Sequence, residues 1–148
     1  MRVVVQRALN ASCVVDGQVV GKIDKGFMIL VGFTNGDSLD EIKLLAKKVS
    51  GLRVFEDEAG KMNLGLKDVN GKILAISQFT LYADCKKGNR PSFIEAMAYE
   101  KANDMFLDFV KELKTYDLDV ETGVFGADMK INFINDGPVT IILDSNFL

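Results

Sequence analysis

The stretch Cys13-Val14-Val15-Asp16-Gly17-Gln18-Val19-Val20 predicts a β-hairpin near the start of the chain. β-Branched residues flank Asp16-Gly17 on both sides, and a two-residue primed turn suits this pair because glycine tolerates a positive φ. A second segment rich in β-branched residues, Val3 to Leu9, precedes it. The chain therefore opens with β-structure.

Beyond the hairpin, a second strand pair is predicted at Gly21 to Asp24 and Gly26 to Phe33. The latter segment is apolar throughout, which indicates a strand covered on both faces. A tight turn is predicted at Asn70-Gly71. The remaining predicted strands are Leu52 to Phe55, Lys72 to Leu81, Val120 to Thr122, Met129 to Ile134 and Val139 to Leu143.

The first predicted helix begins at a capping box. Ser38 and Glu41 have the spacing at which two side chains satisfy otherwise unpaired amides at a helix start. Apolar residues then follow at helical spacing, and Gly51 ends the helix.

The second predicted helix is long and ends near Tyr116. Its start has two candidates, a capping box of Ser92 with Glu95, or Ala102, where a clean apolar stripe begins. The chain shows no linker and no internal repeat, so residues 1–148 are predicted to form a single domain. We expect an α/β fold of the mixed α+β kind, with mixed, largely antiparallel sheets in β/β/α layers and two main helices on the outside.

Charge and composition exclude several classes of protein. The formal net charge is −3, whereas a general nucleic-acid coating protein is normally strongly basic, so any RNA contact would come from a local basic patch and from shape. We expect no DNA partner. The chain contains no histidine, which excludes Ser-His-Asp and Cys-His catalysis and histidine metal sites. Proton transfers in an enzyme of this sequence would run through carboxylates, lysine, water or the substrate.

The two cysteines indicate the compartment. Cys13 and Cys85 lie far apart and outside any Cys-x-x-Cys spacing, so a disulfide or zinc framework is not predicted and a reducing cytoplasm fits best. No apolar run reaches the length of a membrane span, and the first residues lack the features of a signal peptide. We expect no metal, no cofactor and no membrane partner.

Ser77-Gln78-Phe79-Thr80 is the first candidate site. Alternate residues of a strand share a face, so Gln78 and Thr80 are predicted to point the same way. A buried polar group without a partner costs about 1–3 kcal/mol, so the polar groups of this apolar strand need partners. They either hydrogen-bond to neighbouring backbone at the end of the strand or face a ligand.

Asn135-Asp136-Gly137-Pro138-Val139-Thr140 is the second candidate site. A Gly-Pro pair marks a turn, and proline suits the first position of a strand because no ladder donor is lost. About 5–6% of X-Pro bonds are cis. The residues alone therefore favour a trans turn between two strands.

Two glycine-containing loops are further candidates. Cys85-Lys86-Lys87-Gly88-Asn89-Arg90-Pro91 places three positive charges within five residues, either as a solvated charge run or as a phosphate contact. In Gly123-Val124-Phe125-Gly126-Ala127-Asp128-Met129, the ring of Phe125 either belongs to the core or stacks on a base.

Taken together, an ordered set of segments resembles the bacterial and eukaryotic type of D-aminoacyl-tRNA deacylase. The set spans nearly the whole chain and is far more specific than any single short motif. Minor departures are Ala83 and Asn89, where Gly and a basic residue are expected. The segments are Met1 to Arg7, Leu52-Arg53-Val54-Phe55-Glu56-Asp57 with Lys61-Met62-Asn63, Ser77-Gln78-Phe79-Thr80-Leu81-Tyr82, Arg90-Pro91-Ser92-Phe93, Phe125-Gly126-Ala127-Asp128-Met129 and Asn135-Asp136-Gly137-Pro138-Val139-Thr140.

The resemblance implies a hydrolase that releases D-amino acids from aminoacylated tRNA and also accepts glycyl groups on non-cognate tRNA. It implies a homodimer with active sites at the subunit interface. In that picture the Gly137-Pro138 bond is cis, and this pair, with Val139 and Thr140, faces the aminoacyl group and excludes an L side chain sterically. Arg7 resembles the family's arginine that fixes the orientation of this motif.

The resemblance also implies roles for the other candidates. Ser77, Gln78, Phe79 and Thr80 would surround the ester. Thr80 would position it rather than attack it, because no general base is visible for a nucleophile. The 2′-hydroxyl of the terminal adenosine, or water ordered by it, would accept the proton. The remaining implied contacts are Phe125 and Met129 with that adenosine, and Lys86, Lys87 and Arg90 with tRNA phosphates.

Other functions remain open at the level of sequence. A non-catalytic module that binds the acceptor end of tRNA predicts binding without turnover. A D-specific amidohydrolase would need a stronger catalyst than the sequence offers, because amides are less activated than esters. A purely structural domain would leave the ordered motif set unexplained.

Overall fold

The computed structural model describes residues 1–148. Strands and helices alternate irregularly along the chain, with short 3₁₀ helices (η) between them. The elements are β1 (Arg2–Val15), β2 (Gln18–Gly32), α1 (Leu39–Ser50), β3 (Phe55–Glu56), β4 (Met62–Leu64), η1 (Lys67–Val69), β5 (Lys72–Ser77), η2 (Phe79–Tyr82), α2 (Tyr99–Lys114), β6 (Val120–Thr122), β7 (Lys130–Asp144) and η3 (Ser145–Phe147).

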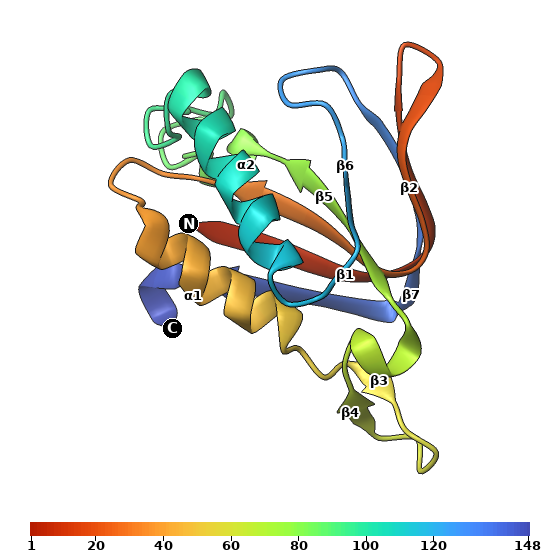
Figure 1. The fold of residues 1–148 in the computed structure, drawn as a ribbon. Coiled ribbons are helices and arrows are strands. Elements are labelled where there is room, and N and C mark those ends of the chain that lie inside the picture. The colour runs from red at the N-terminus through yellow and green to blue at the C-terminus, as the bar shows by residue number, and fades with distance from the viewer.

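Five strands form one mixed sheet in the order β6-β5-β2-β1-β7 (Figure 1). β1 pairs antiparallel with both β2 and β7, whereas β5 pairs parallel with both β2 and β6. β3 and β4 form a separate two-stranded sheet. The predicted mixed α+β class, with two main helices and mainly antiparallel and mixed sheet, is confirmed.

The predicted hairpin is also confirmed. Asp16 and Gly17 join β1 to β2 with φ values of 49° and 76°, and Val15 lies opposite Gln18. The strands are longer than the sequence predicted, because pairing continues through the gaps between the predicted segments. Leu9 lies opposite Lys25 and the ladder resumes beyond it, so β1 and β2 are each continuous.

Two apolar clusters lie on opposite faces of the sheet. Along β2, Phe27 and Ile29 belong to the larger cluster and Met28 to the smaller one, as the alternation of a strand requires. Helices α1 and α2 pack against each other and cover the face of the larger cluster (Figure 1). Ala11 and Ile23, from the far halves of β1 and β2, belong to the smaller cluster on the other face. The five-stranded sheet therefore carries an apolar cluster on each face.

The start of α1 agrees with the sequence. Ser38 accepts a hydrogen bond from the Asp40 amide, Glu41 accepts one from the Ser38 amide, and Gly51 caps the C-terminus. The pKa of Glu41 is lowered, chiefly because the Ser38 hydroxyl donates to its carboxylate. The ionised carboxylate of Glu41 thus stabilises the start of the helix.

The predicted starts of α2 are wrong. The helix begins at Tyr99, after Ala98, which offers no side-chain cap. Ser92 does not cap a helix, because its backbone pairs with Asp84 in an isolated β-bridge that closes the intervening polar loop. No helix of the chain combines the length and apolar character needed to cross a membrane.

Four predicted strands are also corrected. The strand predicted at Lys72 to Leu81 ends at Ser77, and η2 follows. The strand predicted at Leu52 to Phe55 is reduced to β3, Phe55–Glu56, which pairs with β4. The two C-terminal strands predicted on either side of Gly137-Pro138 are one strand, β7, with an interruption in its pairing rather than a turn.

Candidate active site

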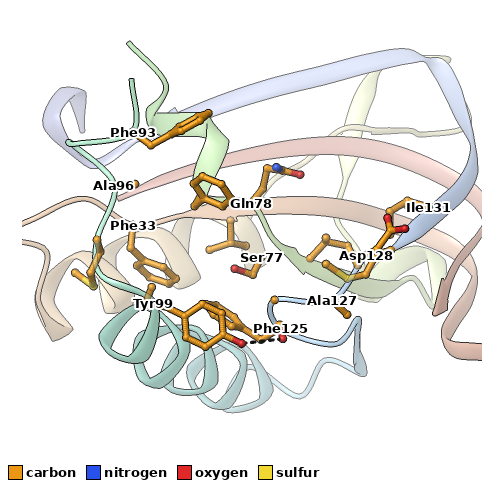
Figure 2. A pocket seen from close by; sticks show the side chains of 17 residues that line it. Phe33, Ser77, Gln78, Phe93, Ala96, Tyr99, Phe125, Ala127, Asp128 and Ile131 are labelled. Carbon is orange, nitrogen blue, oxygen red and sulfur yellow. Dashed lines mark hydrogen bonds between the residues drawn. The ribbon is translucent and has the colours of Figure 1, made fainter. Parts of the chain in front are cut away.

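A pocket of about 480 Å³ opens between the end of β5, the segment before α2, the start of α2 and the loop before β7 (Figure 2). Most of its lining is apolar, as is usual for small-molecule sites. Its 17 lining residues are Val31, Phe33, Ile76, Ser77, Gln78, Phe79, Phe93, Ala96, Met97, Tyr99, Ala102, Phe125, Gly126, Ala127, Asp128, Met129 and Ile131.

Ser77, Gln78 and Phe79 reach the pocket because β5 ends there. The Gln78 amide donates to the Val31 carbonyl oxygen at 2.7 Å, the last backbone contact with β2, and the chain then turns into η2. The sequence missed this break because the polar and apolar residues of the segment alternate as they would in a strand.

Thr80 lies beside the pocket and does not line it. Its side chain is exposed, and its hydroxyl accepts a hydrogen bond from Nε2 of Gln78. No carboxylate, lysine or other base is hydrogen-bonded to this hydroxyl. The geometry therefore couples Thr80 to Gln78 and provides no activation of Thr80 as a nucleophile.

Aromatic side chains line much of the pocket. Phe79 meets Phe93 edge-on with ring centroids 5.0 Å apart, and Tyr99 meets Phe125 in the same way, also at 5.0 Å. Figure 2 shows Phe93 across the cavity from Tyr99 and Phe125. Phe125 is half-buried, which combines both roles considered from the sequence, since it packs against the core and also lines the pocket.

Sequence reasoning missed Tyr99 as a pocket residue. Tyr99 lies between the two predicted starts of the helix, and it is not part of the segments that carry the family resemblance. A usable signal was its spacing, because Tyr99 stands three residues before Ala102 and seven before Phe106 on the buried stripe of α2. Phe33 was treated only as part of an apolar strand.

The second candidate segment lies in β7, opposite Arg7. Gln6 pairs with Thr140 and Ala8 pairs with Asn135, so four residues of β7 bulge out opposite Arg7. The Gly137-Pro138 bond in this bulge is cis, as the resemblance implied and against the trans turn favoured by the residues alone. Both residues are exposed.

Arg7 fixes the base of this bulge. Its guanidinium is buried and donates from Nε to the Asp136 carbonyl oxygen at 2.8 Å and from Nη1 to the Val54 carbonyl oxygen at 2.7 Å. It also pairs with both carboxylate oxygens of Glu56, and this hydrogen bonding holds the pKa of Glu56 below its usual range. On the far side of the bulge, Val139 donates its amide to the side chain of Asn135.

The structure thus gathers some predicted site residues and separates others. Ser77, Gln78, Phe79, Phe125 and Met129 line one pocket. The rest lie outside that pocket within this single chain, and Lys86, Lys87 and Arg90 are on an exposed loop. The residues outside it are Arg7, Thr80, Gly137, Pro138, Val139, Thr140, Lys86, Lys87 and Arg90.

Fold and site together define a single-domain α+β protein with a concave, aromatic-lined ligand pocket. Comparison with known proteins identifies the family of the chain. Residues 4–144 match the family described as D-Tyr-tRNA(Tyr) deacylase. The chain belongs to this family.

Curated relatives match along nearly their whole length. A D-aminoacyl-tRNA deacylase of Lactobacillus gasseri is 57% identical over 97% of this chain and 99% of its own. One of Clostridium novyi is 55% identical over 98% of this chain and 97% of its own.

Solved structures are similar in fold. One described as c-Myc DNA Unwinding Element Binding Protein superposes with a TM-score of 0.91 at 40% identity and covers 98% of this chain and 99% of its own. A probable eukaryotic D-amino acid tRNA deacylase superposes with a TM-score of 0.82 at 17% identity, over 96% of this chain and 97% of its own, which supports the fold alone.

Proposed function

We propose that this protein hydrolyses the ester bond of D-aminoacyl-tRNA and releases a free D-amino acid and tRNA. Membership of the deacylase family supports the reaction class. The observation that carries the proposal is the pocket at the end of β5. Ser77, Gln78 and Phe79 line it together with aromatic side chains, and it is large enough for a nucleoside.

The chemistry fits a chain without histidine. An aminoacyl ester is already activated, so positioning and electrostatic help suffice to accelerate its hydrolysis. The 2′-hydroxyl of the terminal adenosine, or water ordered by it, accepts the proton in this proposal. The substrate thereby supplies the group that histidine supplies in other hydrolases.

Residues around η2 position the ester. The first amides of a helix have no acceptor within it, so those of Phe79 and Thr80 are suited to bind the ester oxygens. Thr80 is held by Gln78 and acts with it as a positioning group rather than as a covalent catalyst. Ser77 lines the pocket beside them.

The remainder of the tRNA 3′ end follows the surface. Phe125 and Met129 contact the terminal adenosine inside the pocket. The exposed side chains of Lys86, Lys87 and Arg90 meet phosphates farther along the strand.

Chirality is read by the bulge of β7 in a homodimer, with each active site completed by the partner subunit. Two observations support this arrangement. The exposed bulge is anchored by buried Arg7, although the aromatic-lined pocket of the single chain does not include it. The edge strand β7 also exposes Ile134 and Ile142, and an apolar sheet edge of this length favours pairing with another chain.

Selection in this proposal works by rejection. Main-chain groups of Gly137 and Pro138, with Val139 and Thr140, leave no room for an L side chain and do not read the identity of a D side chain. Glycine has no side chain to exclude, so glycyl groups on non-cognate tRNA are also substrates. The tRNA substrate and the unpaired Cys13 and Cys85 agree with a location in the cytoplasm.

The test is hydrolysis of matched D-tyrosyl-tRNA and L-tyrosyl-tRNA by the purified protein, with and without chelator. Rapid loss of the D ester alone, unaffected by chelator, is expected. Binding of tRNA without hydrolysis of either ester would overturn the proposal in favour of a non-catalytic module for the acceptor end. Glycyl-tRNA charged on a non-cognate tRNA, assayed in parallel, tests the achiral substrate.

A further inference from the structure

Tyr99 is a large aromatic residue that is mostly exposed to the pocket and not buried in the core. It is the first residue of α2 and continues the buried stripe of that helix by one turn, but its side chain is 62% exposed. Ala102 and Phe106, farther along the same stripe, are buried in the core. The ring therefore projects beyond the core and lines the pocket instead.

The Tyr99 ring is nevertheless held in place. It packs edge-on against Phe125 at an interplanar angle of 77°, and its hydroxyl donates to the Phe125 carbonyl oxygen at 3.4 Å. Gly126 leaves room for it, because a Cβ at that position would lie 2.3 Å from Oη of Tyr99. Figure 2 shows Tyr99 on the pocket wall with its hydroxyl turned towards Phe125.

The other side of the pocket repeats this arrangement. Phe79 and Phe93 also form an edge-on pair, and their side chains are 53% and 39% exposed. Exposed aromatic rings that face one cavity from two sides suit a flat aromatic ligand, since every nucleobase offers a π-face for stacking.

We propose that Tyr99 is a binding residue for the terminal adenine of the substrate and holds that base by stacking on it. This inference rests on the proposed function, which brings the 3′ end of tRNA to the pocket. It adds a residue whose effect is confined to binding, because its ring packs against Phe125 and makes no hydrogen bond to the ester-positioning segment at η2.

Kinetics of three variants test the role of the ring. Loss of a stacked base contact weakens binding roughly 5- to 150-fold, so Tyr99→Ala should raise KM for D-tyrosyl-tRNA by that factor and leave kcat within about twofold. Tyr99→Phe should retain KM, and Tyr99→Leu, which is apolar but not flat, should behave as Tyr99→Ala does. Leu107→Ala is the matched control, because Leu107 is an exposed residue of the same helix outside the pocket.

Fluorescence tests the contact without turnover. The chain has no tryptophan and three tyrosines, and Tyr99 is the exposed one, whereas Tyr82 is buried and Tyr116 is partly buried. Adenosine should quench the tyrosine emission of the natural protein, and uridine, with its smaller ring, should quench it less. Tyr99→Phe should bind adenosine in calorimetry but show no quenching.

The outcomes separate this inference from the proposed function. If the natural protein hydrolyses D-tyrosyl-tRNA and Tyr99→Ala and Tyr99→Leu keep its KM, Tyr99 does not bind the base and the inference is overturned. If the natural protein hydrolyses neither ester, the proposed function fails, and quenching by adenosine alone then decides the inference. A rise in KM that Leu107→Ala reproduces would also overturn it.

Discussion

At the scale of single residues, Arg7 connects three segments that are distant in sequence. Its guanidinium donates to Val54 and Asp136 and pairs with Glu56. Arg7→Met should lower the free energy of unfolding by about 1–3 kcal/mol, because buried carbonyl oxygens lose their donor. Urea denaturation measures this. Arg53→Met is the control, since Arg53 bonds only to exposed Asn63, and an equal loss in both variants would contradict the prediction.

The Arg7–Glu56 pair also predicts a pH dependence. The pKa of Glu56 is lowered from an ordinary value of 4.5, mainly by the hydrogen bond from Arg7. A lowered pKa stabilises the fold above the ordinary value, and this stabilisation is lost as the pH falls through the folded value. The stability difference between the natural protein and Glu56→Gln should therefore be constant from pH 7 to about pH 5 and shrink below pH 4.5. A difference that grows on acidification would refute the assignment.

The role of Thr80 is a further prediction at this scale. The hydroxyl is held by Gln78 and has no base, so Thr80→Val should lower kcat on D-tyrosyl-tRNA roughly 5- to 150-fold, as expected for one lost hydrogen bond. Removal of a covalent nucleophile would instead cost about a millionfold. Single-turnover kinetics separate these outcomes. Thr122→Val, on β6 and outside the pocket, is the control.

At the scale of elements, the two helices begin differently. Ser38 caps α1, so Ser38→Ala should destabilise the protein by about 1 kcal/mol. Ala98 precedes α2 with an extended backbone and no cap, so Ala98→Ser should stabilise it by roughly 0.5–2 kcal/mol. Thermal unfolding of both variants measures the two shifts, which should have opposite signs. Shifts of the same sign would show that the caps do not control these helix ends.

Elements also show how far local sequence signals reach. The Asp16-Gly17 hairpin and the Ser38 cap depend on neighbouring residues, and both were predicted correctly. The end of β5 and the start of α2 were not. β5 ends where its partner β2 ends, and Ser92 pairs with Asp84 in an isolated bridge, so neither boundary follows from the immediately neighbouring residues.

Some residues of the candidate site were also predictable from local sequence, and others were not. Ser77 to Phe79 stood out because polar groups interrupt an apolar strand, and the structure places them in the pocket. The helical spacing of Tyr99 places it on the stripe of α2, but its position in the pocket depends on the contact of α2 with Phe125 in the loop before β7. The cis bond at Gly137 was implied by the resemblance alone, since the residues themselves favoured trans.

At the scale of the whole molecule, the proposed dimer makes the last prediction. The double variant Ile134→Lys/Ile142→Lys places charges on the exposed edge strand β7 and should shift the protein to a monomer in analytical ultracentrifugation. Activity on D-tyrosyl-tRNA should fall in parallel, because each site is completed by the partner. Leu107→Lys, at an exposed position of α2, should leave the oligomeric state and the activity unchanged. An active monomer would remove the partner from the proposed site.

The position of β1 between β2 and β7 has a consequence for the making of the protein. Arg2 lies opposite Gly32 on one side and opposite Asp144 on the other, so the N-terminal strand of the fold is completed by its C-terminal strand. The β1–β2 hairpin can form as soon as it leaves the ribosome, but one edge of β1 stays open until β7 has also left it. Contacts of such long range slow folding. An enzyme proposed to guard the fidelity of translation therefore completes its own fold only after β7 has been synthesised.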